Sequence, residues 1–353
     1  MGVDRARTRP LSEFSPGILS VEHFRAIPKI DLHRHLEGSL RLTTLLEIGR
    51  QYGLDIPNTS QLRALVQIRE DEAFTFQNFL SKFQTLRKFF RSPEIIGRLT
   101  REVIADAAAD NVRYLELRFT PIALSRSNNL SLGEVIDQVS TSTRQADRDF
   151  NIRTRLIVSV NRHEGPDLAA QVVEQAIQHM DNGLLVGLDL AGDETSTPVQ
   201  LFAGVFREAR QAGLHITIHA GEWGGPQNIA EAVTVLGAKR IGHGIRVLED
   251  PAVTAFARQQ QLVFEVCVTS NYHSGVVPAL AMHPLPRMSA RGLIVTINTD
   301  DPSICQVNLS EEYRRVRQEM GFSEAMINTC IDAAVRSAFI PQAEKPGLAE
   351  LLK

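Results

Sequence analysis

The feature that most constrains the fold is the alternation of short, apolar, β-branched runs with segments of helical periodicity. Eight such runs occur, over residues 29–35, 112–120, 155–162, 184–192, 214–221, 239–245, 262–270 and 293–301. Most adjoin stretches in which apolar residues recur every three or four positions. A strand and a helix repeated eight times are typical of a parallel (β/α)8 barrel, so we predict an α/β fold of the TIM type.

A doubly wound open sheet is the competing architecture. It predicts a glycine-rich phosphate loop after an early strand, but the sequence contains neither GxGxxG nor GxxxxGK[ST]. The gap between the first two runs is far longer than the others, and its patterns predict a helical insertion over residues 36–110. We therefore expect a single barrel domain over residues 21–353, including this insertion, after a flexible leader over residues 1–20.

Composition excludes several classes of partner. The 353 residues carry a net charge of −3 and only 6% aromatic residues, which argues against a nucleic-acid surface. No run approaches the length of a membrane span, and the first 17 residues lack the apolar stretch of a secretory signal. Cys267, Cys305 and Cys330 form no CxxC pair, which favours a reducing compartment. We expect a cytoplasmic protein with a small-molecule partner, no nucleic acid and no membrane.

Ionisable residues gather at the carboxyl ends of the predicted strands. His33 and His35 end the first run, and residues two apart in a strand share a face. The ends of three later runs carry His219, Glu222, His243, Asp300 and Asp301. Parallel barrel strands bring these ends to one opening, where three histidines and a carboxylate suit Zn²⁺. The HxH pair alone is a weak signal for a metal site; the combination of strand ends is much stronger.

The motifs at these strand ends resemble those of the adenosine deaminase family, within the zinc amidohydrolase superfamily. The matching segments are PKIDLHRHLEGSLR, NVRYLELRFTP, LDLAGDE, HAGE, IGHGI, FEVCVTSN and INTDDP, and they follow the family's order. They span most of the chain, from Pro28 to Pro302. The resemblance implies an eight-stranded β/α barrel with one catalytic zinc ion per chain and a purine nucleoside or base as its substrate.

The resemblance also implies a role for individual residues. The ligands of the zinc ion would be His33, His35, His219 and Asp300. Glu222 would be the proton shuttle that faces purine N1, and His243 would orient the attacking water. The substrate contacts would be Glu37 near the ribose or its replacement, the backbone N–H of Gly192 at N3, Asp301 at N7, and an apolar lid of Phe76, Phe79, Leu80 and Phe83.

The implied reaction is zinc-dependent hydrolytic deamination. Adenosine would become inosine, and deoxyadenosine would become deoxyinosine, each with release of ammonia, when zinc-activated hydroxide attacks purine C6. A protonated Glu222 can donate to N1 as charge develops there, and an apolar pocket would raise its pKa as this requires. The HxE and PCxxC pattern of zinc-dependent cytosine deaminases is absent, so any similarity to them is one of chemistry.

The substrate has alternatives that the sequence leaves open. Glu37 stands in HLEG, whereas HLDG is usual in the adenosine-specific branch. Glutamate here is similar to relatives that act on free adenine or on other adenine-bearing compounds, including 6-aminodeoxyfutalosine. If Glu37 does not read the sugar, the competing interpretation is that its side chain caps the helical turn that follows.

Two other functional classes deserve comparison. A two-metal hydrolase on this barrel would usually carry a bridging carboxylated lysine at the end of the fourth strand, and LDLAGDE contains no lysine. A catalytically inactive zinc-binding barrel predicts the loss of a ligand or of the shuttle acid, yet all are present. Of the remaining residues, we expect His163 to make a structural hydrogen bond, Cys267 to pack in a strand, and Trp223 to line the opening or cover a loop. We expect the other histidines to be structural or solvent-exposed, namely His23, His179, His215, His273 and His283. The sequence carries no signal for an oligomeric state.

Overall fold

The structure is a computed structural model that describes residues 19–54, 56, 58–180 and 183–352. The predicted leader falls largely outside this range. Within the described residues the chain forms one sheet of eight parallel strands in the order β1 to β8. The strands are β1 (Lys29–His35), β2 (Val112–Phe119), β3 (Arg153–Asn161), β4 (Leu185–Ala191), β5 (His215–Ala220), β6 (Arg240–His243), β7 (Val263–Val266) and β8 (Ile294–Ile297). The predicted TIM-type barrel is therefore confirmed.

The sheet approaches closure at a single point between its first strand and the segment after its last. The His35 N–H donates to the Asp300 carbonyl at 2.8 Å, and the Asp300 N–H donates to the His33 carbonyl at 2.8 Å. Arg34 and Asp300 form an isolated parallel bridge there. The backbone that completes the barrel thus belongs to residues that the sequence selects as metal ligands.

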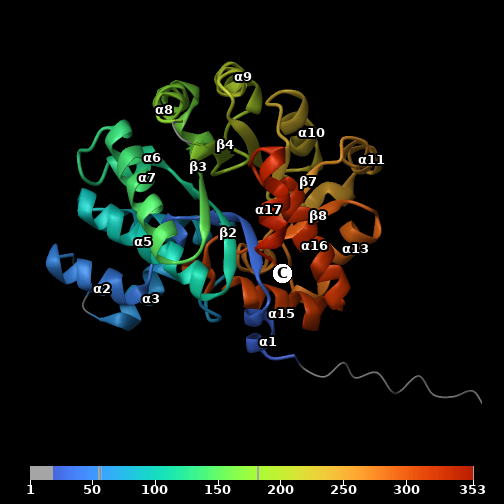
Figure 1. The fold of residues 1–353 in the computed structure, drawn as a ribbon, viewed down its shortest axis with the longest axis horizontal. Coiled ribbons are helices and arrows are strands. Elements are labelled where there is room, and N and C mark those ends of the chain that lie inside the picture. Colours follow the sequence, from blue (N-terminus) through green and yellow to red (C-terminus); the bar gives the residue numbers. More distant parts are fainter. Residues whose placement is uncertain (1–18, 55, 57, 181–182, 353) are drawn as a thin grey trace, which may run out of the picture.

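Helices that follow the strands in the chain surround the sheet (Figure 1). They are α5 (Pro93–Ala109), α7 (Leu132–Asp149), α8 (Pro166–Gln178), α9 (Ala203–Gln211), α10 (Pro226–Thr234), α11 (Pro251–Gln259), α13 (Leu285–Ala290), α15 (Leu309–Met320) and α16 (Glu324–Ser337). Their ends follow ordinary capping chemistry: a capping box of Ser131 and Glu134 begins α7, and the Ser92 side chain with Pro93 begins α5. Shorter helices are α1 (Val21–Ala26), α6 (Pro121–Ser125), α12 (Val268–His273), α14 (Pro302–Cys305) and α17 (Lys345–Glu350).

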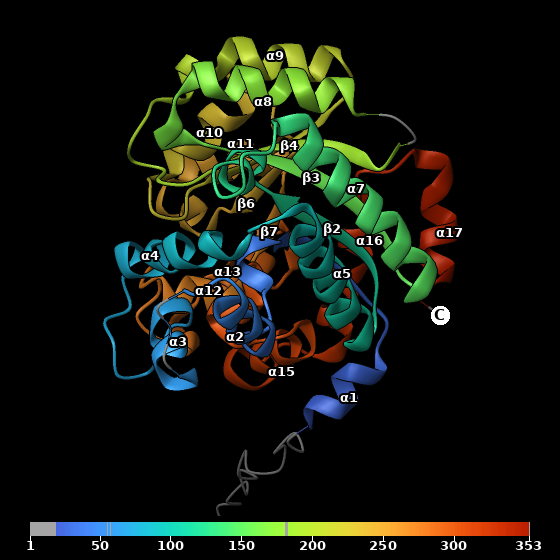
Figure 2. The same ribbon diagram turned by 90° about the vertical axis from the view of Figure 1, so that its left-hand side faces the viewer.

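The long segment between β1 and β2 is helical, as its sequence predicts. It contains η1 (Glu37–Ser39), α2 (Leu42–Gln51), α3 (Thr59–Val66), α4 (Phe76–Leu86), η2 (Arg87–Phe89) and the barrel helix α5. Figure 2 shows α2, α3 and α4 gathered at one side of the barrel. Further 3₁₀ turns are η3 (Arg162–Glu164), η5 (Val199–Phe202), η6 (Ile245–Glu249), η7 (Leu280–Met282) and η8 (Gln342–Glu344).

The apolar core lies between the sheet and the helices, whereas the barrel interior is charged. Leu115, Leu188 and Phe264 are fully buried members of the apolar core. Arg118 on β2 reaches across the barrel to Asp189 on β4, at 3.2 Å, and to Glu265 on β7. Buried charges are costly unless they are paired, and these are. The interior therefore holds an ion-pair network directly beneath the strand ends.

Two strands, β7 and β8, end four residues before the predicted runs end. The run 262–270 leaves the sheet after Val266, because its second half forms α12. The run 293–301 leaves the sheet after Ile297, although Asp300 still forms the closing bridge. After β7 an apolar, β-branched run continues past the strand, and such a run does not by itself distinguish strand from buried helix. After β8 the remaining residues of the run, 298–301, are polar, and the predicted strand extends past its apolar part. No helix within the described ranges combines the length and hydrophobicity that a membrane span requires.

Candidate active site

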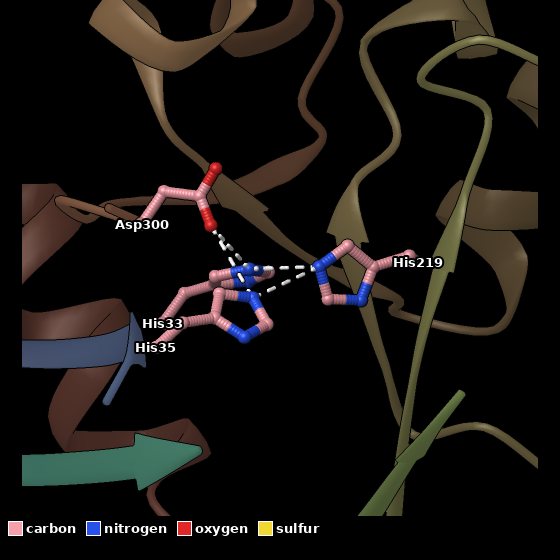
Figure 3. Close-up of side chains that lie close together, drawn as sticks. All are labelled: His33, His35, His219 and Asp300. Atoms are coloured by element: carbon pink, nitrogen blue, oxygen red, sulfur yellow. Dashed lines mark hydrogen bonds and ion pairs between the residues drawn. The ribbon is translucent and has the colours of Figure 1, made fainter. Parts of the chain in front are cut away.

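Four residues from three separate segments of the chain meet at the carboxyl end of the barrel. Figure 3 shows His33 and His35, both at the end of β1, converging with His219 and Asp300. The Nε2 atom of His219 lies 3.1 Å from Nε2 of His33 and 3.3 Å from Nε2 of His35. The Oδ1 atom of Asp300 lies 3.2 Å from Nε2 of His33 and 3.3 Å from Nε2 of His35. The four ligand atoms all lie within 4.8 Å of one another.

The donor atoms of these side chains are suited to a cation. The Nδ1 atom of His33 lies 2.8 Å from Glu265 Oε2, and Nδ1 of His219 lies 3.0 Å from Asp189 Oδ1. A carboxylate only accepts, so each Nδ1 carries the proton and each Nε2 presents a lone pair. Two such lone pairs face each other beside a carboxylate oxygen. This arrangement is repulsive on its own and favourable around Zn²⁺, so the residues fit the metal that the sequence predicts.

The two carboxylates behind the histidines are ionised. Burial alone would raise the pKa of Glu265, but Arg118, Arg240 and the His33 hydrogen bond hold it well below its ordinary value. Burial likewise opposes ionisation of Asp189, whose pKa is nevertheless lowered by the facing His219 and Arg118. Both side chains are fully buried. They fix the orientation of two imidazole rings from inside the barrel.

Two residues at this end of the barrel adopt an unusual backbone conformation. His243 has φ 58° and Asp300 has φ 63°, in the left-handed region that L-residues with side chains rarely occupy. His243 Nε2 lies 3.8 Å from Asp300 Oδ2, and the His33 and His243 rings are 4.9 Å apart between centroids. Such strain is typical of sites where surrounding contacts hold a side chain in one required place.

Glu222 follows β5 and is held by a second glutamate. The Glu194 carboxylate accepts from the backbone N–H groups of Glu222, Trp223 and Gly224, at 3.1, 3.0 and 2.8 Å. Burial raises the pKa of Glu222 well above its ordinary value, and the nearby carboxylates of Asp300 and Glu194 add to the effect. Glu222 is therefore a buried acid that can keep its proton at neutral pH.

A cavity of about 320 Å³ opens onto these groups. Its lining contains most of the predicted substrate contacts, namely Glu37, Phe79, Leu80, Phe83, Gly192 and Asp301, together with Glu222 and His243. Phe76 lies outside this lining, within the described chain, and packs on Trp223 with ring centroids 5.1 Å apart. The structure thus brings Phe79, Leu80 and Phe83 to the cavity and leaves Phe76 beside it.

Glu37 does not cap the following helix. It lies in η1, and its Oε1 accepts from the Thr120 backbone N–H at 3.2 Å. Its Oε2 is buried and has no hydrogen-bond partner among the described residues, so it is available to a ligand. Arg87, which the sequence did not single out, lines the same cavity with its Nη2 3.9 Å from Glu37 Oε1.

Asp301 is the second buried acid in the cavity. Burial raises its pKa well above the ordinary value, and Asp300, Glu37 and Glu222 add to the effect. The HLEG glycine, Gly38, allows this close approach, because a Cβ atom there would lie 1.7 Å from Asp301 Oδ1. Gly192, with φ +82°, turns the chain beside His163, which also lines the cavity.

Several functional residues were missed at the level of sequence. Glu265, Asp189 and Arg118 form the network beneath the histidines, and Asn271 contacts both Glu222 and His243. A signal existed for the first three, since each is a charged residue inside an apolar strand run. Asn271 lies within the quoted motif FEVCVTSN, but nothing in its spacing indicates which groups it contacts.

A second cluster of potential ligands shares two members with the first. His33, His243, Cys267 and Asp300 also have ligand atoms within 4.8 Å of one another. Burial raises the pKa of the Cys267 thiol well above its ordinary value, and nearby carboxylates add to the effect. A thiol that keeps its proton is a poor metal ligand, so the three histidines and Asp300 are the better set.

Comparison with known proteins agrees with this geometry. Residues 28–353 match the family model described as Adenosine deaminase. The adenosine deaminase of Klebsiella pneumoniae strain 342 is 35% identical over 325 residues, which cover 92% of this chain and 97% of that protein.

Two solved structures share the fold. The adenine deaminase of Arthrobacter aurescens has a TM-score of 0.86 at 29% identity, covering 93% of this chain and 98% of the other. An amidohydrolase from Burkholderia ambifaria with bound Zn has a TM-score of 0.86 at 28% identity, covering 95% and 93%. The sequence-level prediction of the family is thus confirmed. This chain belongs to the adenosine deaminase family and is a hydrolase of carbon–nitrogen bonds other than peptide bonds.

Proposed function

We propose that this enzyme hydrolyses the 6-amino group of adenosine and deoxyadenosine, giving the 6-oxopurine nucleoside and ammonia. One observation carries the proposal. A four-atom metal-binding set and a buried carboxylic acid open onto a single cavity whose volume and lining suit a purine. The curated adenosine deaminase relative, at 35% identity over nearly its whole length, supports the choice of substrate.

In this proposal one zinc ion per chain is held by His33, His35, His219 and Asp300. The opposed imidazole lone pairs support the assignment, as does the zinc-bound structural neighbour. When bound, zinc lowers the pKa of a coordinated water to about 7 and so supplies hydroxide at neutral pH. His243 Nε2 and Asp300 Oδ2, which lie 3.8 Å apart, would orient the attacking water.

Glu222 supplies the proton that the reaction needs. Attack at C6 breaks the aromaticity of the ring and places charge on N1, where a protonated Glu222 donates. The bond from C6 to the oxygen forms as N1 gains the Glu222 proton. The Glu222 carboxylate that results takes the proton of the new C6 hydroxyl and passes it to the amino nitrogen, and the bond from C6 to that nitrogen then breaks to release ammonia. Burial of Glu222 keeps the acid form available, and the hydrogen bonds from its loop to Glu194 hold it in place.

The remaining contacts hold the purine and its substituent. Phe79, Leu80 and Phe83 form the apolar cover, the Gly192 N–H meets N3, and Asp301 meets N7. Phe76 supports this cover indirectly through Trp223. Glu37 has a free oxygen in the cavity, which suits a sugar hydroxyl donor. We retain the cytoplasm as the predicted compartment, from cysteine usage alone.

Free adenine is the second candidate substrate. The similarity to a structure of an adenine deaminase, at a TM-score of 0.86, favours it. A kinetic panel of adenosine, deoxyadenosine, adenine, N6-methyladenosine and 6-aminodeoxyfutalosine on the zinc-loaded protein decides the question. We expect the highest kcat/KM for the two nucleosides. Absence of amine release from every member (methylamine from N6-methyladenosine, ammonia from the others), with zinc bound at one per chain, would refute the proposal.

Glu37→Gln tests which substituent the cavity reads. If Glu37 accepts from a ribose hydroxyl, the variant loses about ten- to hundredfold in kcat/KM for adenosine and spares adenine, because only the nucleoside makes the charge-assisted bond. Both substrates and the melting temperature are measured on the same preparation. Equal losses for adenosine and adenine would instead make Glu37 a structural residue.

A further inference from the structure

Asn271 contacts two groups that the proposed reaction uses, Glu222 and His243. It is fully buried on α12. Its side-chain nitrogen donates to Glu222 Oε1 at 3.1 Å and lies 3.1 Å from His243 Nδ1. Glu222 Oε1 and His243 Nδ1 are 3.6 Å apart, which is too far for a direct hydrogen bond. The amide therefore bridges the two groups.

A buried histidine fixes which way this amide faces. The Leu285 backbone N–H donates to His283 Nδ1 at 3.1 Å, and His283 Nε2 lies 3.3 Å from Asn271 Oδ1. A backbone N–H can only donate, so His283 Nδ1 is an acceptor and Nε2 carries the ring proton. That proton is donated to Asn271 Oδ1. Burial lowers the pKa of His283 to about 3, which keeps the ring neutral and this pattern intact.

The amide orientation decides where two catalytic protons lie. With Oδ1 occupied by His283, the NH₂ group of Asn271 faces Glu222 and His243, and each of its hydrogens has one acceptor. His243 Nδ1 must then be unprotonated, which leaves the ring proton on Nε2, the atom that faces Asp300. Glu222 Oε1 is an acceptor as well, so the proton of the acid lies on Oε2.

We propose that Asn271 and His283 are positioning residues of the deaminase, which hold His243 as the Nε2–H tautomer and Glu222 with its proton on Oε2. What the two catalytic groups then do rests on the proposed function, whereas the protonation pattern rests on the hydrogen bonds. A His243 with its proton on Nε2 has no lone pair directed at the cavity. It therefore orients the attacking water as a donor and does not take its proton.

His283→Gln and His283→Asn form a matched pair that tests this chain of hydrogen bonds. Glutamine places an amide nitrogen near the position of Nε2 and preserves the donor to Asn271. Asparagine places its amide near the position of Nδ1 and is too short to donate to Asn271. We expect His283→Gln to keep kcat within about threefold, and His283→Asn to lower kcat by about tenfold, with KM and zinc content unchanged in both. A merely structural role would lower the melting temperature and kcat of both variants alike, and that result would overturn the proposal.

Imidazole nitrogen spectra give a readout independent of turnover. Long-range ¹H–¹⁵N correlation on the zinc-loaded protein should show His243 and His283 as Nε2–H tautomers. Asn271→Asp replaces the NH₂ by an acceptor, so His243 should gain a proton on Nδ1. Asn271→Leu should lower kcat by about ten- to hundredfold, because both catalytic groups lose their shared donor.

The outcomes separate this inference from the proposed function. A wild-type His243 protonated on Nδ1, or wild-type kcat in Asn271→Leu, would overturn the inference while deamination stands. Failure to deaminate any purine would refute the proposed function, and the tautomers of His243 and His283 would still test the hydrogen-bond chain.

Discussion

Glu265→Gln removes the charge on which both the barrel interior and one metal-binding histidine depend. The Glu265 carboxylate is fully buried and faces four donors. His33 Nδ1, at 2.8 Å, and Arg118 Nη2 share Oε2. Thr217 Oγ1, at 3.1 Å, and Arg240 Nε, at 2.6 Å, face Oε1. An amide offers one acceptor and one donor, so one of these pairs must face an NH₂ group.

The magnitude follows from what each arginine retains. Breaking a buried ion pair by removing one partner costs roughly 3–5 kcal/mol. Arg118 keeps Asp189, at 3.2 Å, and Arg240 keeps Glu116, so the lower end of that range applies. We expect the free energy of unfolding to fall by about 3 kcal/mol. The Glu265 carboxylate orients the His33 ring and keeps its proton on Nδ1. Loss of this anion should therefore also weaken zinc binding by about 10–100-fold.

Thr217→Val is the matched control, because it removes one donor from the same carboxylate without touching His33. Loss of that neutral hydrogen bond should lower the free energy of unfolding by about 1 kcal/mol and leave zinc affinity within about threefold. Urea unfolding of the metal-free proteins and chelator competition for zinc measure the two quantities. If Glu265→Gln kept zinc affinity within threefold and lost less than 1 kcal/mol, Glu265 would not be the anion that holds His33.

Three other changes give distinct outcomes. His219→Ala should lower zinc content and turnover together, and full values of both would remove His219 from the ligand set. Glu222→Gln should keep zinc but lose about 10²–10⁴-fold in kcat, because an amide cannot exchange a proton; a loss below tenfold would exclude the shuttle role. Burial raises the pKa of Glu312 from 4.5 to about 7, so between these values the folded state keeps a proton that the unfolded state releases. The stability that this group contributes is complete below pH 4.5 and is lost as the pH rises to 7. The free energy of unfolding of Glu312→Gln and of wild type is therefore compared at pH 4.5 and at pH 8. Relative to wild type, the variant should gain about 3 kcal/mol at the higher pH, and a difference that stays constant with pH would contradict this.

The barrel could be predicted because its signal repeats. Most of the strand runs are rich in β-branched residues, and helical patterns lie between the runs along the whole barrel. The ends of β7 and β8 could not be predicted. The apolar run of β7 continues into α12, and of residues 298–301 only Asp300 still pairs with a neighbouring strand, as an isolated bridge. Where buried strand gives way to buried helix, composition does not change and periodicity needs more residues than the segment has.

The convergence of the candidate metal ligands could be predicted from the sequence because it follows from topology. Parallel strands in a barrel bring their carboxyl ends together, so His33, His219 and Asp300 meet whatever their separation in sequence. The lid was less accessible, since the rotation of α4 decides which phenylalanines face the cavity. Phe79 and Phe83, four residues apart, line it, whereas Phe76 faces Trp223. A stripe of apolar residues identifies the buried face of a helix, but it does not show which part of that face lines the cavity and which part packs on Trp223.

The charged residues inside the strands carry the information that the apolar pattern lacks. Arg118, Asp189 and Glu265 interrupt apolar runs, and alternation alone would assign such residues to a solvent-facing side. In a closed barrel both faces are buried, so each charge requires an opposite charge on another strand. The network that results ends at the Nδ1 atoms of His33 and His219. The folded chain thereby aims the imidazole lone pairs at one point, and ion pairs across the barrel set the orientation of the proposed metal site.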